Sequence, residues 1–133
     1  MAEPSAPAPA LLVLVVDDVE DNRDMYAQFL RHEGWRVATA ADGVEGLAMA
    51  TQLRPDIIVL DLGLPRIDGW DVARRLKESP ITRPIPVLAL TGHVSNESRL
   101  RALMVGVSEF CTKPCLPADL VAAIRRNLRP APA

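Results

Sequence analysis

Short runs of apolar, strand-forming residues alternate with amphipathic segments along most of this chain. A segment with helical spacing follows each of these runs, which cover residues 11–16, 36–40, 57–60, 87–90 and 107–111. The runs 11–16 and 57–60 are continuously apolar, as is typical of central parallel strands, whereas 36–40 is weaker and suits a position near an edge. The pattern predicts five strands, each followed by a helix.

Strands that alternate with helices require a parallel sheet with right-handed crossover connections. Five such units predict an α/β fold, a (βα)5 doubly wound five-stranded parallel sheet with a flavodoxin-like layout and the strand order 2-1-3-4-5. In sheets of this kind, functional sites lie at the carboxyl ends of the strands. Residues that end or follow a predicted strand are therefore expected to carry the chemistry.

The helical segments carry boundary signals and apolar stripes. Asp42 and Glu45 have the spacing of a capping box before the second helix, and Gly34 follows the first helix. We interpret the apolar positions at helical spacing as core: Met25 with Phe29 and Tyr26 with Leu30; Val44, Leu47 and Ala48; Trp70, Ala73 and Leu76; Leu100, Leu103, Met104 and Val107; Leu120, Ile124 and Leu128.

Length and composition indicate one soluble domain. The chain has 133 residues, of which 49% are apolar and 24% charged. Residues 1–10 and 129–133 are rich in Ala and Pro and are expected to be flexible tails around a domain at 11–128. Cys111 and Cys115 are too few for a disulfide framework, and we expect reduced thiols.

Charge and hydropathy exclude several classes of protein. A net charge of −2 argues against direct binding of nucleic acid. No apolar run is long enough to span a membrane, and none has the preceding positive charge of a signal peptide, so we expect a cytoplasmic protein. Acidic residues gather between Asp17 and Asp24, whereas from Arg99 onward six basic residues meet only Glu109 and Asp119, which indicates different partners for the two regions.

Polar side chains converge at one edge of the predicted sheet. Asp17 and Asp18 follow the first strand, Asp61 the third, Thr91 the fourth and Lys113 the fifth. Neighbouring strands lie about 4.8 Å apart, so these groups are within reach of one another. Carboxylates this close repel by roughly 4 kcal/mol per pair at ~4 Å unless a cation compensates. A hard divalent cation such as Mg²⁺, which prefers oxygen ligands, is the natural solution.

These groups match the needs of phosphoryl transfer. An aspartate is a competent nucleophile toward phosphorus, and the reaction then depends on positioning and on neutralising the three equatorial oxygens. Mg²⁺ is expected to take one oxygen, the Lys113 ammonium another, and the Thr91 hydroxyl with backbone N–H groups the third.

Five motifs in a fixed order extend this interpretation to the whole predicted domain: Val15-Val16-Asp17-Asp18, Asp61-Leu62-Gly63-Leu64-Pro65, Asp68-Gly69, Thr91-Gly92 and Lys113-Pro114. In order and spacing they resemble the receiver domain of two-component response regulators, in particular its single-domain, chemotaxis-regulator-like members. The resemblance implies that Asp61 receives its phosphoryl group from a histidine kinase or a histidine phosphotransfer protein.

The resemblance also assigns the metal site. Asp17, Asp18, Asp61 and the backbone carbonyl of Gly63 are expected to hold Mg²⁺, with Mn²⁺ as a substitute. Phosphorylation is then the only chemistry expected of the chain, together with loss of the phosphoryl group, so the protein is a signalling switch and not an enzyme.

The resemblance further implies how the phosphoryl group is sensed. Thr91 and Lys113 contact it, Phe110 turns inward, and the Lys113-Pro114 peptide bond is expected to be cis. Gly63, Gly92 and His93 are expected at the rim of the site: Gly92 adjoins the switch threonine, and the other two influence access of water.

Five alternative interpretations remain. In the first, Asp18 or Asp21 is not part of a functional site but an ordinary cap of the first helix. In the second, Phe110 is an ordinary core residue and not a switch. An aspartate-dependent phosphohydrolase of the haloacid-dehalogenase type needs a second acid where Gly63 stands. A nucleotide-binding fold would need a glycine-rich phosphate-binding loop, and this sequence contains none. A receiver-like adaptor that is never phosphorylated has no reason to keep all five site residues.

Output is expected through binding. The surface of the fourth helix, fifth strand and fifth helix, with Arg99, Arg101, Arg125 and Arg126, is predicted to change its affinity for a downstream protein that the sequence does not identify. The protein is expected to be a monomer or a phosphorylation-dependent dimer.

Overall fold

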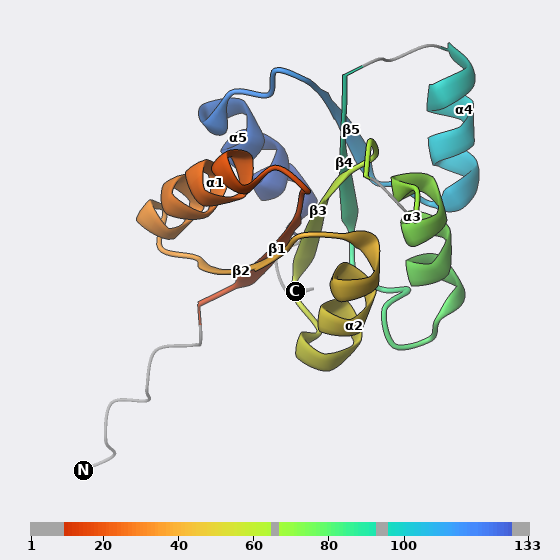
Figure 1. Cartoon of the computed structure of the whole chain (residues 1–133), viewed down its shortest axis with the longest axis horizontal. Helices are drawn as coiled ribbons and strands as arrows, with labels where there is room; N and C mark the ends of the chain where they lie inside the picture. The colour runs from red at the N-terminus through yellow and green to blue at the C-terminus, as the bar shows by residue number, and fades with distance from the viewer. Residues whose placement is uncertain (1–9, 65–66, 93–95, 129–133) are drawn as a thin grey trace, which may run out of the picture.

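In the computed structural model, which describes residues 10–64, 67–92 and 96–128, the strands form one parallel sheet in the order β2-β1-β3-β4-β5 (Figure 1). The strand order and the α/β class predicted from the sequence are thereby confirmed. The predicted tails lie outside the described residues except for Ala10, and so does His93.

Strands and helices alternate strictly along the chain. The strands are β1 (Leu12–Val16), β2 (Arg36–Ala40), β3 (Ile57–Asp61), β4 (Val87–Thr91) and β5 (Glu109–Thr112). The helices are α1 (Glu20–His32), α2 (Gly43–Leu53), α3 (Gly69–Glu78), α4 (Asn96–Val105) and α5 (Pro117–Asn127).

The last strand starts later than its apolar run predicts. The run begins at Val107, whereas β5 begins at Glu109. Gly106 ends α4 with a φ of +89°, a left-handed conformation that favours glycine, and Val107 is buried in the core beside α3. These residues carry the chain from α4 back to the sheet, so their apolar character reflects packing and not strand pairing.

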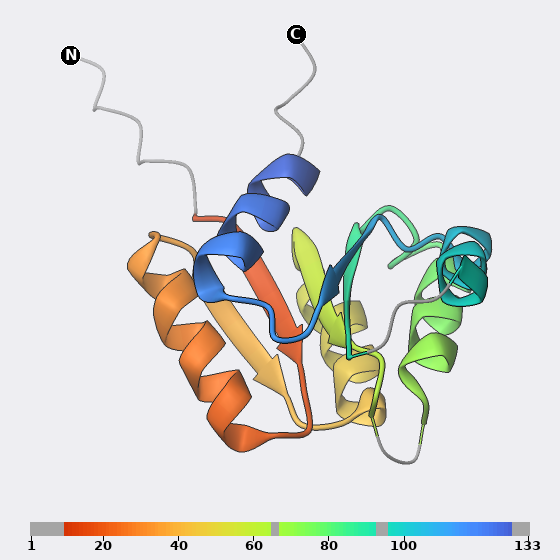
Figure 2. The same cartoon turned by 90° about the horizontal axis from the view of Figure 1, so that it is seen from above.

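The sheet lies between two layers of helices. Figure 2 shows α1 and α5 on one side and α2, α3 and α4 on the other. Each side has its own core: Tyr26 and Leu30 pack with Leu120 and Ile124, and the opposite cluster includes Leu76. β1 and β3 are buried almost throughout, as their continuously apolar sequences predict.

Part of the predicted helical core is exposed, and those predictions were wrong. The exposed positions are Met25, Phe29, Val44, Leu100 and Met104. In this fold each helix covers one face of the sheet, so only one of two adjacent stripes is buried, as α1 shows with Tyr26 and Leu30. On α2 the buried positions are Gly43, Gly46 and Ala50, small residues that apolar periodicity does not detect.

Two predicted helix boundaries are confirmed. The Asp42 carboxylate caps α2 by accepting a hydrogen bond of 2.8 Å from the Glu45 N–H. Gly34 follows α1 with a φ of +93°. By contrast, the N-cap of α1 is Val19, with no side-chain hydrogen bond, so the alternative in which Asp18 or Asp21 caps this helix is wrong.

A buried tyrosine connects α1 to the chain after β5. The Tyr26 hydroxyl donates a hydrogen bond of 2.9 Å to the Cys115 carbonyl. Burial is the main reason that the pKa of Tyr26 rises to about 12, and burial likewise raises the pKa of Cys111 to about 12. Both groups therefore hold their protons more tightly in the folded chain than in the unfolded one.

Stability is consequently expected to decline at alkaline pH. Below about pH 8 both groups are protonated in both states, whereas at higher pH the unfolded chain ionises first, which lowers its free energy relative to the folded chain. Urea unfolding from pH 8 to 11 should show a fall of up to about 1.4 kcal/mol per pH unit for each group that ionises. Tyr26→Phe combined with Cys111→Ser should reduce this dependence and leave the part due to Cys115, whose pKa is also raised by burial. An unchanged slope would contradict the assignment.

Candidate functional site

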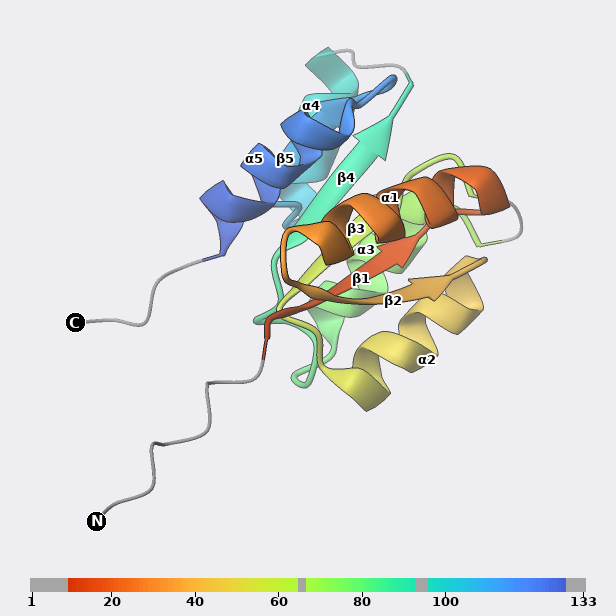
Figure 3. The same ribbon diagram turned by 90° about the vertical axis from the view of Figure 1, so that its left-hand side faces the viewer.

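The carboxyl ends of four strands bring the predicted site residues to one edge of the sheet. Figure 3 shows the strands running in the same direction. Asp17 and Asp18 directly follow β1, Asp61 ends β3, Thr91 ends β4, and Lys113 directly follows β5. The Lys113 N–H donates a hydrogen bond of 2.7 Å to the Thr91 carbonyl, which extends the pairing of β4 with β5 to the site.

Asp61 is held between two donors. Its Oδ1 accepts a hydrogen bond of 2.9 Å from the Gly63 N–H, and its Oδ2 accepts one of 2.8 Å from the Lys113 ammonium. Asp61 is only 3% exposed, whereas Lys113 reaches it from a half-buried position. Because the Asp61 carboxylate is largely sheltered from water, this ion pair is stronger than one on an open surface.

Asp17 has one satisfied and one unsatisfied carboxylate oxygen. Its Oδ1 accepts a hydrogen bond of 2.9 Å from the Val19 N–H at the start of α1. Its Oδ2 is buried and has no hydrogen-bond partner among the described residues. Burial raises the pKa of this carboxyl group, and the nearby Asp61 charge adds to the rise. A buried acceptor without a donor is costly, and a bound cation is one way to satisfy it.

Asp17, Asp18 and Asp61 each offer a carboxylate oxygen, and these three oxygens lie within 4.8 Å of one another. Asp18 is exposed while the other two are buried, so the cluster has one side open to solvent. Oxygen donors with an open side suit Mg²⁺, which keeps several water ligands. The donor set and the unsatisfied Oδ2 of Asp17 therefore fit the cation that the sequence predicts.

The other residues predicted for the site lie on β5 or shortly after β3, β4 and β5. Gly92 is exposed beside Thr91, and Phe110 on β5 is half-buried against the core on the α3 side. The Lys113-Pro114 peptide bond, expected to be cis, is cis in the structure. Gly63 contributes its N–H to Asp61, whereas its role through the carbonyl stays a prediction.

Gly69 contributes to the site in a way that the sequence did not reveal. It opens α3 after the Asp68 cap, and it also packs directly on the end of β3. A Cβ at position 69 would lie 2.5 Å from the Leu62 Cα and 2.6 Å from the Asp61 carbonyl oxygen. Only glycine allows α3 to come this close to the strand that carries Asp61.

Replacing Asp17 with asparagine is expected to stabilise the protein by about 1–3 kcal/mol in buffer without divalent ions. The change removes a buried charge next to two carboxylates, and the amide can donate to their oxygens. Millimolar Mg²⁺ should stabilise the wild type, by about 2.7 kcal/mol at a hundred times its Kd, and should do little for the variant. Urea unfolding with EDTA or Mg²⁺ measures both effects, and a destabilised Asp17→Asn protein in EDTA would contradict the prediction.

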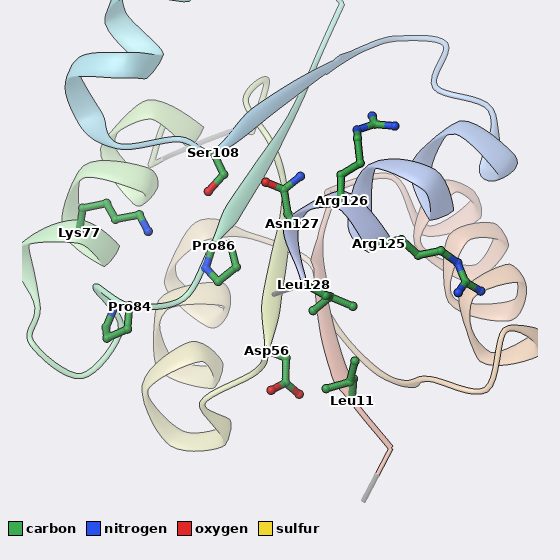
Figure 4. A pocket seen from close by; sticks show the side chains of 10 residues that line it. All are labelled: Leu11, Asp56, Lys77, Pro84, Pro86, Ser108, Arg125, Arg126, Asn127 and Leu128. Carbon is green, nitrogen blue, oxygen red and sulfur yellow. The ribbon is translucent and has the colours of Figure 1, made fainter. Parts of the chain in front are cut away.

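A hollow of about 800 Å³ opens at the opposite edge of the sheet (Figure 4). Its lining comprises Leu11, Asp56, Lys77, Pro84, Pro86, Ser108, Arg125, Arg126, Asn127 and Leu128. The charged groups in it already have partners on the protein: Arg125 with Glu33, Arg126 with Glu109, Lys77 with the Arg83 and Ile85 carbonyls, and Asp56 with the Leu12 N–H. The hollow contains none of the predicted site residues.

The basic residues predicted for the output surface do not all lie on it. Arg101 on α4 and Arg126 on α5 are exposed, and Arg126 pairs with Glu109 on β5. Arg125 instead pairs with Glu33 after α1, and its guanidinium lies 5.3 Å from the centroid of the Trp35 ring. Arg125 therefore faces α1 and not α4, while the side chain of Arg99 lies outside the described set.

In the part of the chain that the structure describes, no helix is both long enough and apolar enough to cross a lipid bilayer.

Comparison with known proteins gives a consistent result. The model of one family, described as response regulator receiver domain, matches residues 13–125. Response regulator PleD of Caulobacter vibrioides is 43% identical over 117 residues, which cover 88% of this chain and 26% of that protein. The probable transcriptional regulatory protein TcrX of Mycobacterium tuberculosis is 41% identical over 118 residues, 88% of this chain and 49% of that protein. The chain thus spans between about a quarter and a half of the length of these relatives.

Solved structures agree with this match. Chemotaxis protein CheY4 of Vibrio cholerae has a TM-score of 0.86 at 33% identity, over 90% of this chain and 99% of that one. The receiver domain of sensor histidine kinase PA1611 of Pseudomonas aeruginosa has a TM-score of 0.81 at 29% identity, over 90% and 98% of the two chains. In that protein a magnesium ion is coordinated in the active site cleft.

Proposed function

Because the chain belongs to the response regulator receiver domain family, we propose that Asp61 accepts a phosphoryl group from a histidine kinase or a histidine phosphotransfer protein. Receiver domains interact with histidine kinases and are signalling switches, not classical enzymes. The observation that carries the proposal is the convergence on Asp61 of two carboxylates and one ammonium from two other strand ends, those of β1 and β5.

The transfer is a displacement at phosphorus. A lone pair of an Asp61 carboxylate oxygen forms the new P–O bond, while the P–N bond of the phosphohistidine breaks and its electron pair stays on the imidazole nitrogen. The Lys113 ammonium, now 2.8 Å from Asp61 Oδ2, is placed to bind a phosphoryl oxygen. Thr91, at the adjacent strand end, is proposed to bind another.

The carboxylate cluster is typical of the Mg²⁺ site of receiver domains. We assign Asp17, Asp18, Asp61 and the Gly63 carbonyl as the groups that hold Mg²⁺, or Mn²⁺ in its place. The bound cation would supply charge neutralisation for the phosphoryl oxygens. The buried and unsatisfied Oδ2 of Asp17 supports this assignment, because it needs a positive partner.

The test is direct labelling. Incubation with acetyl phosphate and Mg²⁺, followed by mass spectrometry, should place one phosphoryl group on Asp61, stable to acid and released by hydroxylamine. Asp61→Asn should take no label, and EDTA should prevent labelling of the wild type. Asp56→Asn is a matched control, because Asp56 precedes the same strand at its other end and should leave labelling intact. Label on Asp61→Asn, or none on the wild type, would overturn the proposal.

A phosphohydrolase with an aspartate nucleophile is the competing function. Enzymes of the haloacid-dehalogenase type use a second acid two residues beyond the nucleophile, and Gly63 occupies that position here. The proposed switch predicts that the chain turns over its own phosphoryl group without releasing phosphate from added phosphomonoesters.

The surface of α4, β5 and α5 is proposed to report phosphorylation to a partner protein, in a monomer or a phosphorylation-dependent dimer. NMR shifts confined to the metal site on phosphorylation would contradict this output.

A further inference from the structure

Trp70 occupies a junction between the acidic site and α4. It is the second residue of α3 and directly follows Gly69, whose backbone packs on the Asp61 carbonyl and on Leu62. The Trp70 N–H donates a hydrogen bond of 2.6 Å to the Asp68 carboxylate, which fixes the start of the helix. The backbone of Trp70 is therefore tied to the end of β3, the strand that carries Asp61.

The Trp70 side chain also touches the strand that leads to Lys113. Its ring meets the Phe110 ring edge to face, with centroids 6.3 Å apart and planes at 73°. Phe110 lies on β5 three residues before Lys113, whose ammonium pairs with Asp61. Two chains of contacts thus lead from Asp61 to this aromatic pair. One runs through Gly69 to Trp70, and the other runs through Lys113 and β5 to Phe110.

Arg101 connects the same ring to α4. Its guanidinium carbon lies 4.7 Å from the centroid of the Trp70 ring, within the range of a cation–π interaction. Arg101 is exposed and comes from the helix that faces solvent beside α3 (Figure 1). One tryptophan therefore makes contact with both α4 and β5.

We propose that Trp70 is a positioning residue that couples the charge at Asp61 to the position of α4, through its contacts with Phe110 and Arg101. This inference rests on the proposed phosphorylation of Asp61 and names the side chains that transmit it. The contacts occur with Asp61 unmodified and Lys113 bound to its carboxylate. They therefore stabilise the unphosphorylated arrangement, and removing them shifts the population toward the phosphorylated one.

The chain provides its own matched probes. It has two tryptophans, and each has an arginine over its ring: Arg101 over Trp70 and Arg125 over Trp35. The second pair lies between α5 and the region after α1, remote from the described site contacts. Trp35→Phe leaves Trp70 as the only indole fluorophore, and Trp70→Phe leaves Trp35.

The first measurement is tryptophan emission during titration with beryllofluoride, a phosphoryl mimic, in the presence of Mg²⁺. In Trp35→Phe the emission intensity and acrylamide quenching of Trp70 should change and saturate with binding. In Trp70→Phe the emission of Trp35 should stay constant through the same titration. Constant Trp70 emission at saturation, or equal changes in both variants, overturns the proposal.

The second measurement is the beryllofluoride affinity of arginine variants. Arg101→Ala should bind two- to five-fold more tightly than the wild type, the factor expected from loss of one exposed cation–π contact. Arg101→Lys, which keeps a cation over the ring, should lie closer to the wild type, and Arg125→Ala should equal it. An unchanged or weaker affinity in Arg101→Ala overturns the proposal.

Failure of this inference is distinguishable from failure of the proposed function. If acetyl phosphate does not label Asp61, the proposed function fails and the coupling has no signal to carry. If Asp61 is labelled while Trp70 emission and the Arg101→Ala affinity are unchanged, only the coupling through Trp70 fails.

Discussion

Gly69→Ala is expected to destabilise the protein by about 3 kcal/mol and to slow phosphorylation of Asp61 by about a hundredfold. The added Cβ would lie 2.6 Å from the Asp61 carbonyl and 2.5 Å from the Leu62 Cα. Both atoms are backbone at the end of a central strand, so no side chain can rotate away. Either α3 or the end of β3 must shift, and Asp61 moves with β3.

Urea unfolding gives the stability change, and the rate of labelling by acetyl phosphate gives the functional one. Gly92→Ala is the control, because a Cβ there would meet nothing within 4 Å, and its stability should change by no more than about 0.5 kcal/mol. If Gly69→Ala were as stable as Gly92→Ala and were labelled at the wild-type rate, the close packing of α3 on β3 would not be what positions Asp61.

Lys113→Met is expected to destabilise the protein by about 2–4 kcal/mol without divalent ions. Asp61, which is 3% exposed and lies beside Asp17, would lose the ammonium that lies 2.8 Å from its Oδ2. Mg²⁺ should restore most of this loss, because it supplies positive charge to the same carboxylates. The variant should therefore depend on Mg²⁺ for its stability more strongly than the wild type.

Two comparisons distinguish the loss of this ion pair from the loss of any partly buried ammonium. Lys77→Met removes another partly buried ammonium, but that group donates to the Arg83 and Ile85 carbonyls, so its loss should not respond to Mg²⁺. The double variant Asp61→Asn with Lys113→Met should lose much less stability than Lys113→Met alone, since no unpaired carboxylate remains at position 61. Equal losses in the single and double variants would contradict a role of Lys113 as the counter-charge.

Most of the fold was predictable because its signals are local. Continuously apolar runs predict the central strands, and the alternation of strands with helices restricts the sheet to parallel topologies, so the order β2-β1-β3-β4-β5 follows from few alternatives. The exposed Met25 and Val44 were not predictable in the same way, because a stripe of apolar residues does not indicate which neighbouring face meets the sheet. That choice depends on the packing of whole layers.

In the site, as in the fold, the features set by local sequence were predictable and those set by packing were not. Asp17, Asp18, Asp61, Thr91 and Lys113 could be found from the sequence, since parallel strands place their carboxyl ends at one edge. The sequence also placed Arg125 on the output surface, whereas the structure pairs it with Glu33. The packing role of Gly69 could not be found from the sequence, because a glycine required by close packing looks the same in sequence as one required by a turn.

The amino-acid sequence by itself determined the strand order, the acidic edge of the sheet and the lysine beside it, because these follow from local periodicity and from the geometry common to parallel sheets. Only the tertiary structure decided which Asp17 oxygen lacks a donor, how closely Gly69 approaches Asp61, and that Trp70 lies between Phe110 and Arg101. These features depend on distances of a few ångströms between segments far apart in the chain. Such distances are set by how all the layers pack together.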